Sequence, residues 1–159
     1  MISYDNSSVR RQDRLLEESV AIDLLRSGEY GFLAMATEQG GYGVPMNYAV
    51  ADDVIYMHCA VSGRKLRAIE YDNRVSFVVV GKTQLCPSDL TTKYQSVIAE
   101  GGARVVTSDE ERAVALKLIV EKYAPQYASA AAKAMEISLS RTVIVAVKIE
   151  RLAGKQKGM

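Results

Sequence analysis

Three short apolar segments follow one another early in the chain, and this succession limits the folds open to it. They are GFLAMAT at 31–37, YGVPMNYAV at 42–50 and IYMHCA at 55–60, and the turns between them carry glycine or aspartate. Strands joined by such short turns pair as antiparallel hairpins. Pro45 lies inside the second segment and cannot donate to a strand ladder, so that strand needs an edge, a bulge or a rim there.

The remaining pattern adds strands and helices to this meander. The β-branched segments 75–81, 92–106 and 142–154 predict three more strands, and the Gly101–Gly102 pair predicts a bulge in the second of them. Helices are expected at 13–26 with Asp13 as N-cap, at 63–71, from Ser108 to Pro125, and over the alanine-rich residues 127–135. Residues 82–91 read as a loop.

Six strands with helices before, between and after them predict one α+β domain, mainly β, over residues 1–159. We expect an antiparallel sheet closed into a small barrel, with residues 1–10 and 155–159 loose.

Composition narrows the function classes. With 20 basic and 19 acidic residues, the net charge of +1 offers no broad footprint for nucleic acid or an anionic membrane. Two cysteines make no disulfide framework, and neither a signal peptide nor an apolar run of membrane-spanning length is present. A cytoplasmic protein is therefore expected, and any anion must be bound locally.

The stretch YMHCAVSGRKL, residues 56–66, carries the chemically distinctive side chains. His58 is the only histidine, and Cys59 follows it on a strand, so the two side chains point to opposite faces. The spacing therefore disfavours both a metal site and a thiol nucleophile paired with His58 as its base. We expect Cys59 to be a small buried apolar residue.

The end of the same stretch has the chemistry of a phosphate site. A helix beginning at SGRK offers free N–H groups and two cations, Arg64 and Lys65, to an anion. Neither GxxxxGK[ST] nor GxGxxG is present, so this is no Walker loop and no dinucleotide fingerprint. From the residues alone, a solvent-exposed helix start remains the simpler interpretation.

The order of several segments along the chain favours the phosphate site over a merely solvent-exposed helix start. GVPMNYAV, IYMHCAVSGRKL, YDNRVSFVVVG and TKYQSVIAEGGARVV, at 43–50, 55–66, 71–81 and 92–106, together resemble the flavin-binding split-barrel family typified by pyridoxamine 5′-phosphate oxidases. Within that family the chain looks most like Nim-type proteins associated with 5-nitroimidazole resistance. The resemblance covers residues 10–152 and implies a six-stranded antiparallel split β-barrel with peripheral helices. It also implies a homodimer with FMN in clefts between the subunits.

The resemblance also implies which residues contact FMN. The isoalloxazine ring would lie along one strand, the ribityl chain and phosphate along the next, and a third strand would cross from the partner subunit. In that order the residues are Val44, Pro45, Met46, Asn47 and Tyr48, then His58, Cys59, Ala60, Arg64 and Lys65, then Tyr94 and Ser96. Tyr48 or Tyr94 could stack on flavin or substrate, although such aromatic residues more often pack in a core.

The implied activity is an FMN-dependent reduction of nitro compounds such as 5-nitroimidazoles. His58 would then either supply a proton or only shape the cleft. The oxidases' Arg-x-Val-Leu-Leu-Lys run is replaced here by residues 44–48, and their C-terminal Trp and Arg have no match after Thr142, which argues against pyridoxamine phosphate as substrate. The alternatives are a flavin or haem binding module without turnover, and an oxidase or reductase that acts on another metabolite or uses a deazaflavin.

Overall fold

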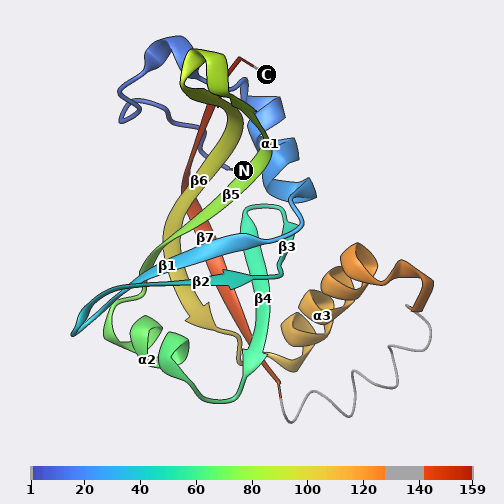
Figure 1. The fold of residues 1–159 in the computed structure, drawn as a ribbon. Coiled ribbons are helices and arrows are strands. Elements are labelled where there is room, and N and C mark those ends of the chain that lie inside the picture. The colour runs from blue at the N-terminus through green and yellow to red at the C-terminus, as the bar shows by residue number, and fades with distance from the viewer. Residues whose placement is uncertain (1, 128–141, 159) are drawn as a thin grey trace.

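A seven-stranded antiparallel sheet forms the body of the protein in the computed structural model, which describes residues 2–127 and 142–158 (Figure 1). Along the sheet the strands lie in the order β2-β1-β5-β6-β7-β4-β3. Their bounds are β1 Gly31–Thr37, β2 Gly40–Met46, β3 Ala49–Ala51, β4 Val54–Ala60, β5 Arg74–Cys86, β6 Thr91–Val105 and β7 Thr142–Lys157. The antiparallel, mainly β architecture predicted from the sequence is confirmed.

The sheet curls around one core, although its hydrogen bonds do not close it. Buried side chains from strands across the sheet, such as Leu33, Met46, Met57, Phe77 and Val145, belong to a single cluster. β2 and β3 remain the two edges because no ladder joins them. The sequence predicted a sheet closed into a barrel, and this was wrong for the strand ladder, which stays open between β2 and β3.

The count of six strands was also wrong, because the segment expected at 42–50 breaks into β2 and β3. The break falls at Asn47 and Tyr48. Tyr48 is fully buried, and its N–H donates to the Tyr123 hydroxyl at 2.9 Å rather than to a neighbouring strand. A side-chain partner thus replaces the ladder where the chain turns inward.

The predicted loop at 82–91 is mostly strand. β5 continues to Cys86 and β6 starts at Thr91, with only a 3-10 turn, η2 (Pro87–Asp89), between them. Most side chains of β5 within residues 82–86 are exposed, so no alternation of apolar and polar residues marks this part of the strand in the sequence. The bulge predicted at Gly101 is confirmed, since the β6–β7 register shifts between Glu100 and Gly101.

Three α-helices of the described residues cover the sheet: α1 (Glu18–Ser27), α2 (Arg64–Tyr71) and α3 (Asp109–Tyr123). The first starts later than predicted, because Asp13 pairs with Arg11 in a 3-10 turn, η1 (Gln12–Arg14), instead of capping a helix. Ser108 caps α3 as expected, its Oγ accepting from the Glu111 N–H at 3.3 Å. A further 3-10 turn, η3 (Pro125–Tyr127), follows α3. The helix predicted over 127–135 lies, beyond Tyr127, outside the described residues.

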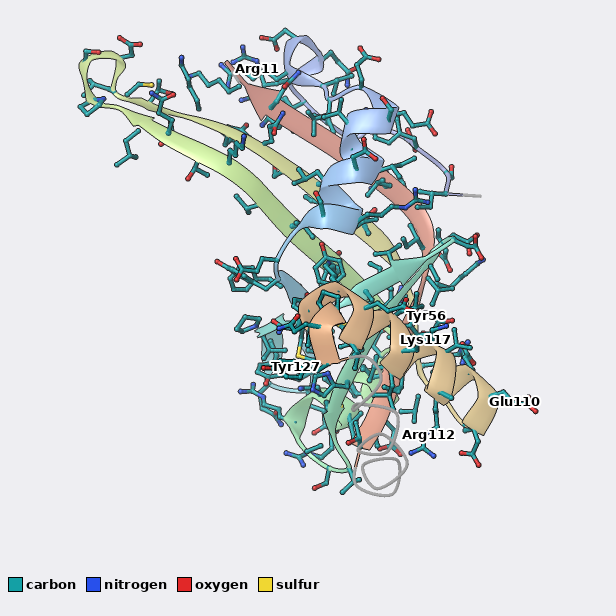
Figure 2. All side chains as sticks on the ribbon, turned by 90° about the vertical axis from the view of Figure 1, so that its right-hand side faces the viewer. Arg11, Tyr56, Glu110, Arg112, Lys117 and Tyr127 are labelled. Carbon is teal, nitrogen blue, oxygen red and sulfur yellow. The ribbon has the colours of Figure 1, made fainter. Side chains whose placement is uncertain are left out.

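The helices occupy different places on the sheet. α1 packs Ala21 and Leu25 into the main core, whereas α3 lies over a second cluster with Tyr56, Ile144 and Ala146. Figure 2 looks onto α3, with Tyr56 beside it. In Figure 1, α2 lies at the opposite end of the molecule from the β5–β6 turn.

The chain ends that were expected to be loose are held in place. Ile2 is buried, the Tyr4 hydroxyl donates to the Leu16 carbonyl, and the Asp5 N–H donates to the Leu152 carbonyl. At the other end, residues 155–157 belong to β7 and pair with β6 as far as Tyr94. Neither end shows as a buried apolar run in the sequence, since these contacts are made largely by backbone. Across the described residues, no helix is long and apolar enough to span a membrane.

Candidate functional site

Strand β2 presents an open backbone edge, as Pro45 predicted. It pairs with β1 alone, Pro45 lying opposite Phe32, and no described strand flanks its other side. Pro45 and Asn47 are exposed, whereas Met46 is buried and Val44 packs against the core. The strand expected along a flavin ring therefore has polar backbone groups available to a ligand.

Helix α2 begins beside this edge with an unusual charge distribution. Gly63 precedes the helix at φ 150°, a conformation that side chains rarely adopt, and no side chain caps the first turn. Arg64 and Lys65 occupy that turn and no acidic residue does. Cations at a helix N-terminus oppose the helix dipole, which favours anions there. The arrangement costs stability in the free protein and suits a bound anion.

Lys65 of α2 interacts with residues of two other predicted segments, β2 and β4. Its Nζ donates to the Met46 Sδ at 3.3 Å, and its charge acts on the Cys59 thiol, lowering a pKa that burial raises more strongly. The structure thus brings Met46 of β2, Cys59 of β4 and Lys65 of α2 together. Arg64 turns a different way, with its guanidinium 4.4 Å from the centre of the Tyr42 ring.

Strand β4 separates His58 from Cys59 as alternation predicted. His58 and Ala60 are exposed, and Cys59 is 8% exposed and part of the main core. Both cysteines of the chain are free thiols. Within residues 2–127 and 142–158, no three His, Cys, Asp or Glu side chains gather closely enough to hold a metal ion.

A pocket of about 420 Å³ lies at the end of β2. Pro45, Met46 and Asn47 line it together with Glu29, Tyr30 and Tyr123. The Tyr123 hydroxyl lies 2.6 Å from the Glu29 carbonyl, 2.9 Å from the Tyr48 N–H and 3.0 Å from the Tyr48 carbonyl. α3 therefore fixes the backbone that forms this pocket wall.

Tyr48 is not available for stacking on a ligand. Its side chain is fully buried, its hydroxyl donates to the Leu25 carbonyl at 2.5 Å, and its ring packs edge-on against Phe77. Desolvation raises the pKa of Tyr48. Of the two roles considered for this side chain, core packing is confirmed over stacking on flavin, and its ring face also carries the Lys122 ammonium at 3.7 Å.

Tyr94 and Ser96 do not join the other predicted residues within one chain. Tyr94 pairs with Lys157 and Ser96 with Val80 and Lys155, on the part of β6 that leads into the β5–β6 turn. That turn and α2 lie at opposite ends of the molecule in Figure 1. A site using both groups needs a second copy of the chain.

Sequence reasoning missed several residues at these sites. Tyr42 follows from strand alternation, since Tyr42, Val44 and Met46 share a face of β2. Arg67 follows from helical spacing, one turn beyond Arg64. Tyr30 lies beside Asn47 because the β1–β2 hairpin pairs Gly31 with Met46, whereas Tyr123 left no local signal, because only the packing of α3 brings it to this pocket.

Comparison with known structures shows the class of fold. The chain is similar to a proposed 5-nitroimidazole antibiotic resistance protein from Bacteroides thetaiotaomicron, with 18% identity, 90% of this chain and 86% of that chain covered, and a TM-score of 0.73. It is also similar to a conserved hypothetical protein from Mycobacterium tuberculosis, with 22% identity, 92% of this chain and 88% of that chain covered, and a TM-score of 0.78. A third similar structure is an FAD and haem binding protein from Mycobacterium smegmatis, with 16% identity, 90% of this chain and 72% of that chain covered, and a TM-score of 0.76.

The family follows from the sequence itself. The family model for pyridoxamine 5′-phosphate oxidase matches residues 17–156. The chain belongs to that family, as the order of its strand segments indicated. No curated protein matches it.

Proposed function

We propose that this protein binds FMN and reduces small nitro compounds, of which 5-nitroimidazoles are an example. The convergence of Lys65, Met46 and Cys59 beside an open strand edge is the observation that carries the proposal. The similarity to a proposed 5-nitroimidazole resistance protein supports the substrate class.

The donor set fits a phosphate monoester. Within the described chain, Lys65 has no carboxylate partner, and the first turn of α2 has neither acid nor side-chain cap. A phosphate monoester carries close to two negative charges at pH 7. The residues that would hold it are Lys65, the amides of the first turn and Arg64, with the ring along residues 44–47 toward the pocket lined by Tyr123.

A bound flavin would supply reversible two-electron chemistry, so no side chain needs to act as a nucleophile. The protein's own residues would bind, orient and exclude water. His58 has an exposed imidazole, a group that can both donate and accept a proton, and it is the residue we propose for proton delivery to the reduced nitro group. The reaction takes electrons from a soluble donor, takes up protons and releases water.

The outer face of the sheet supports a homodimer. Phe32, Val78, Ile98 and Ala153 stand opposite one another on four adjacent strands and form one apolar row. Phe32 and Ile98 are 44% and 43% exposed, so no helix among residues 2–127 and 142–158 covers the row there. Ser96 shares this face of β6 with Ile98, because residues two apart on a strand point the same way. A second copy seated here would bring its own Ser96 to the interface.

Dimer formation is tested by the mass of the protein in solution. Light scattering is expected to give twice the chain mass, and Ile98→Lys to give a monomer with weakened FMN binding. Arg104→Lys, an exposed change on the same strand that keeps the charge, serves as the control. A monomeric wild-type protein that binds FMN normally would refute the dimer.

The cofactor and the reaction are tested on the purified protein. We expect a yellow protein whose released chromophore has the mass of a phosphorylated flavin, either FMN or its adenine dinucleotide FAD. After anaerobic reduction, stopped-flow absorbance should show reoxidation that accelerates with 5-nitroimidazole concentration. A colourless protein with no FMN binding by calorimetry rejects the cofactor, and reoxidation independent of the nitro compound rejects the activity alone.

A second candidate function is a haem or flavin binding module without turnover. The fold is shared with an FAD and haem binding protein, and His58, an exposed imidazole on β4, offers a haem ligand. The absorption spectrum of the purified protein distinguishes haem from flavin, because haem gives an intense band near 400 nm that flavin lacks.

A further inference from the structure

A second pocket lies between α2 and the β1–β2 turn. It measures about 270 Å³ and is lined by residues 37–39 of the β1–β2 turn and by Arg64, Arg67, Ala68 and Tyr71 of α2. Lys65 does not line it. We propose that this pocket binds the adenosine phosphate part of a dinucleotide, an inference that rests on the flavin site proposed above.

The charge of the pocket favours a phosphate. Arg64 and Arg67 lie three residues apart, so both guanidinium groups extend from one face of α2. Neither has an ion-pair partner among residues 2–127 and 142–158, and the Arg67 guanidinium makes no hydrogen bond there either. Glu38 is the only acidic residue in the lining. Its carboxylate can accept from a ribose hydroxyl or from the amino group of adenine.

The far end of the pocket offers an aromatic surface. Tyr71 is 57% exposed although it lies at the end of a helix that buries Ala68 and Ile69. It stands seven residues beyond Arg64 and four beyond Arg67, on the same helical face. At 1.5 Å per residue the helix separates Arg64 from Tyr71 by roughly 10 Å, which is on the scale of an adenosine phosphate. Nucleobases stack readily on such rings.

Arg64 belongs both to this pocket and to the proposed binding site of the flavin phosphate. It lines the pocket and also covers Tyr42 of β2, the strand whose Met46 contacts Lys65. A single phosphate bound at Lys65 leaves Arg67 without a partner. A pyrophosphate running along the start of α2 would reach both Lys65 and Arg67. The geometry therefore favours FAD over FMN, or a nicotinamide dinucleotide bound beside FMN.

Affinity measurements distinguish these sources. Apoprotein is titrated with riboflavin, FMN and FAD, for the wild type, Arg67→Gln and Tyr71→Ala, with Tyr71→Phe as the matched control. We expect FAD to bind at least tenfold more tightly than FMN, and Arg67→Gln and Tyr71→Ala to remove most of that advantage without changing FMN affinity. Tyr71→Phe should retain it. All the substituted side chains are exposed, and circular dichroism checks the fold.

Other outcomes separate this inference from the proposed function. Equal affinities for FMN and FAD, together with NADH or NADPH binding to the FMN-loaded protein that Arg67→Gln weakens, assign the pocket to a nicotinamide dinucleotide. Normal FMN binding with no effect of Arg67→Gln on any dinucleotide overturns the pocket inference alone. Failure to bind any flavin overturns both.

Discussion

Replacing Lys65 by methionine tests the phosphate seat most directly, because methionine keeps the apolar stem beside Met46 and removes only the charge. Lys65 is half-buried and has no carboxylate partner in the described chain, so its loss leaves no buried acid unpaired. Removing one charge-assisted hydrogen bond to a phosphate costs about 1.5–3 kcal/mol. FMN affinity should therefore fall about 10- to 150-fold. Riboflavin, which lacks the phosphate, should bind as before.

The same variant should stabilise the apoprotein. Lys65 lies in the first turn of α2, where a cation opposes the helix dipole by about 0.3–1 kcal/mol. Urea unfolding without flavin should show a gain of that order, and flavin fluorescence titration gives the affinities. Lys82→Met, an exposed lysine on β5, is the control and should change neither quantity. Equal losses for FMN and riboflavin would refute the assignment of Lys65 to the phosphate.

Three further predictions concern stability, each measured by chemical denaturation. Gly101→Ala should destabilise the fold by at least about 3 kcal/mol, because its Cβ would fall 1.9 Å from a β7 carbonyl oxygen; Gly102→Ala, with nothing closer than 3.9 Å, should cost far less. Tyr123→Phe should cost about 1–3 kcal/mol, since it leaves the buried Tyr48 N–H unpaired, and a loss near zero would contradict the role of this hydroxyl. Desolvation lowers the pKa of Lys122 from 10.5 to about 8, so the unfolded chain binds more protons between these values and stability should rise with pH there. Lys122→Met should abolish that rise, and an unchanged pH profile would contradict it.

Strand alternation and the turn residues determined most of what could be predicted from the sequence. Pro45 indicated the open edge, Gly101 the bulge, and Ser108 the start of α3. The alternation of His58 and Cys59 also removed a metal or thiol interpretation of the pair. Each of these depends on local geometry, which a single segment carries by itself.

The errors fell where partners distant in sequence decide the structure. The β5–β6 ribbon and the C-terminal part of β7 hold together by backbone pairing between largely exposed segments, so no apolar pattern marks them. For Tyr48 the sequence left stacking on a ligand and packing in the core both open, and a carbonyl of α1 and the ring of Phe77 decide for the core. Periodicity records which face of a strand is buried and does not record which tertiary neighbour buries it.

Places where the fold violates a local rule identify the candidate sites better than any motif does. α2 concentrates cations at the end of a helix where anions are favoured, and Arg67 adds another that pairs with nothing in the described chain. The buried ammonium of Lys122 likewise has no hydrogen-bond partner there and rests on the Tyr48 ring. Natural sequences tend to keep such conflicts where binding compensates for them. By that reasoning the start of α2 is a ligand site whose unpaired cations a bound phosphate neutralises. Lys122, in the last turn of α3 with its ammonium against the rings of Tyr48 and Tyr123, instead supports the wall of the neighbouring pocket.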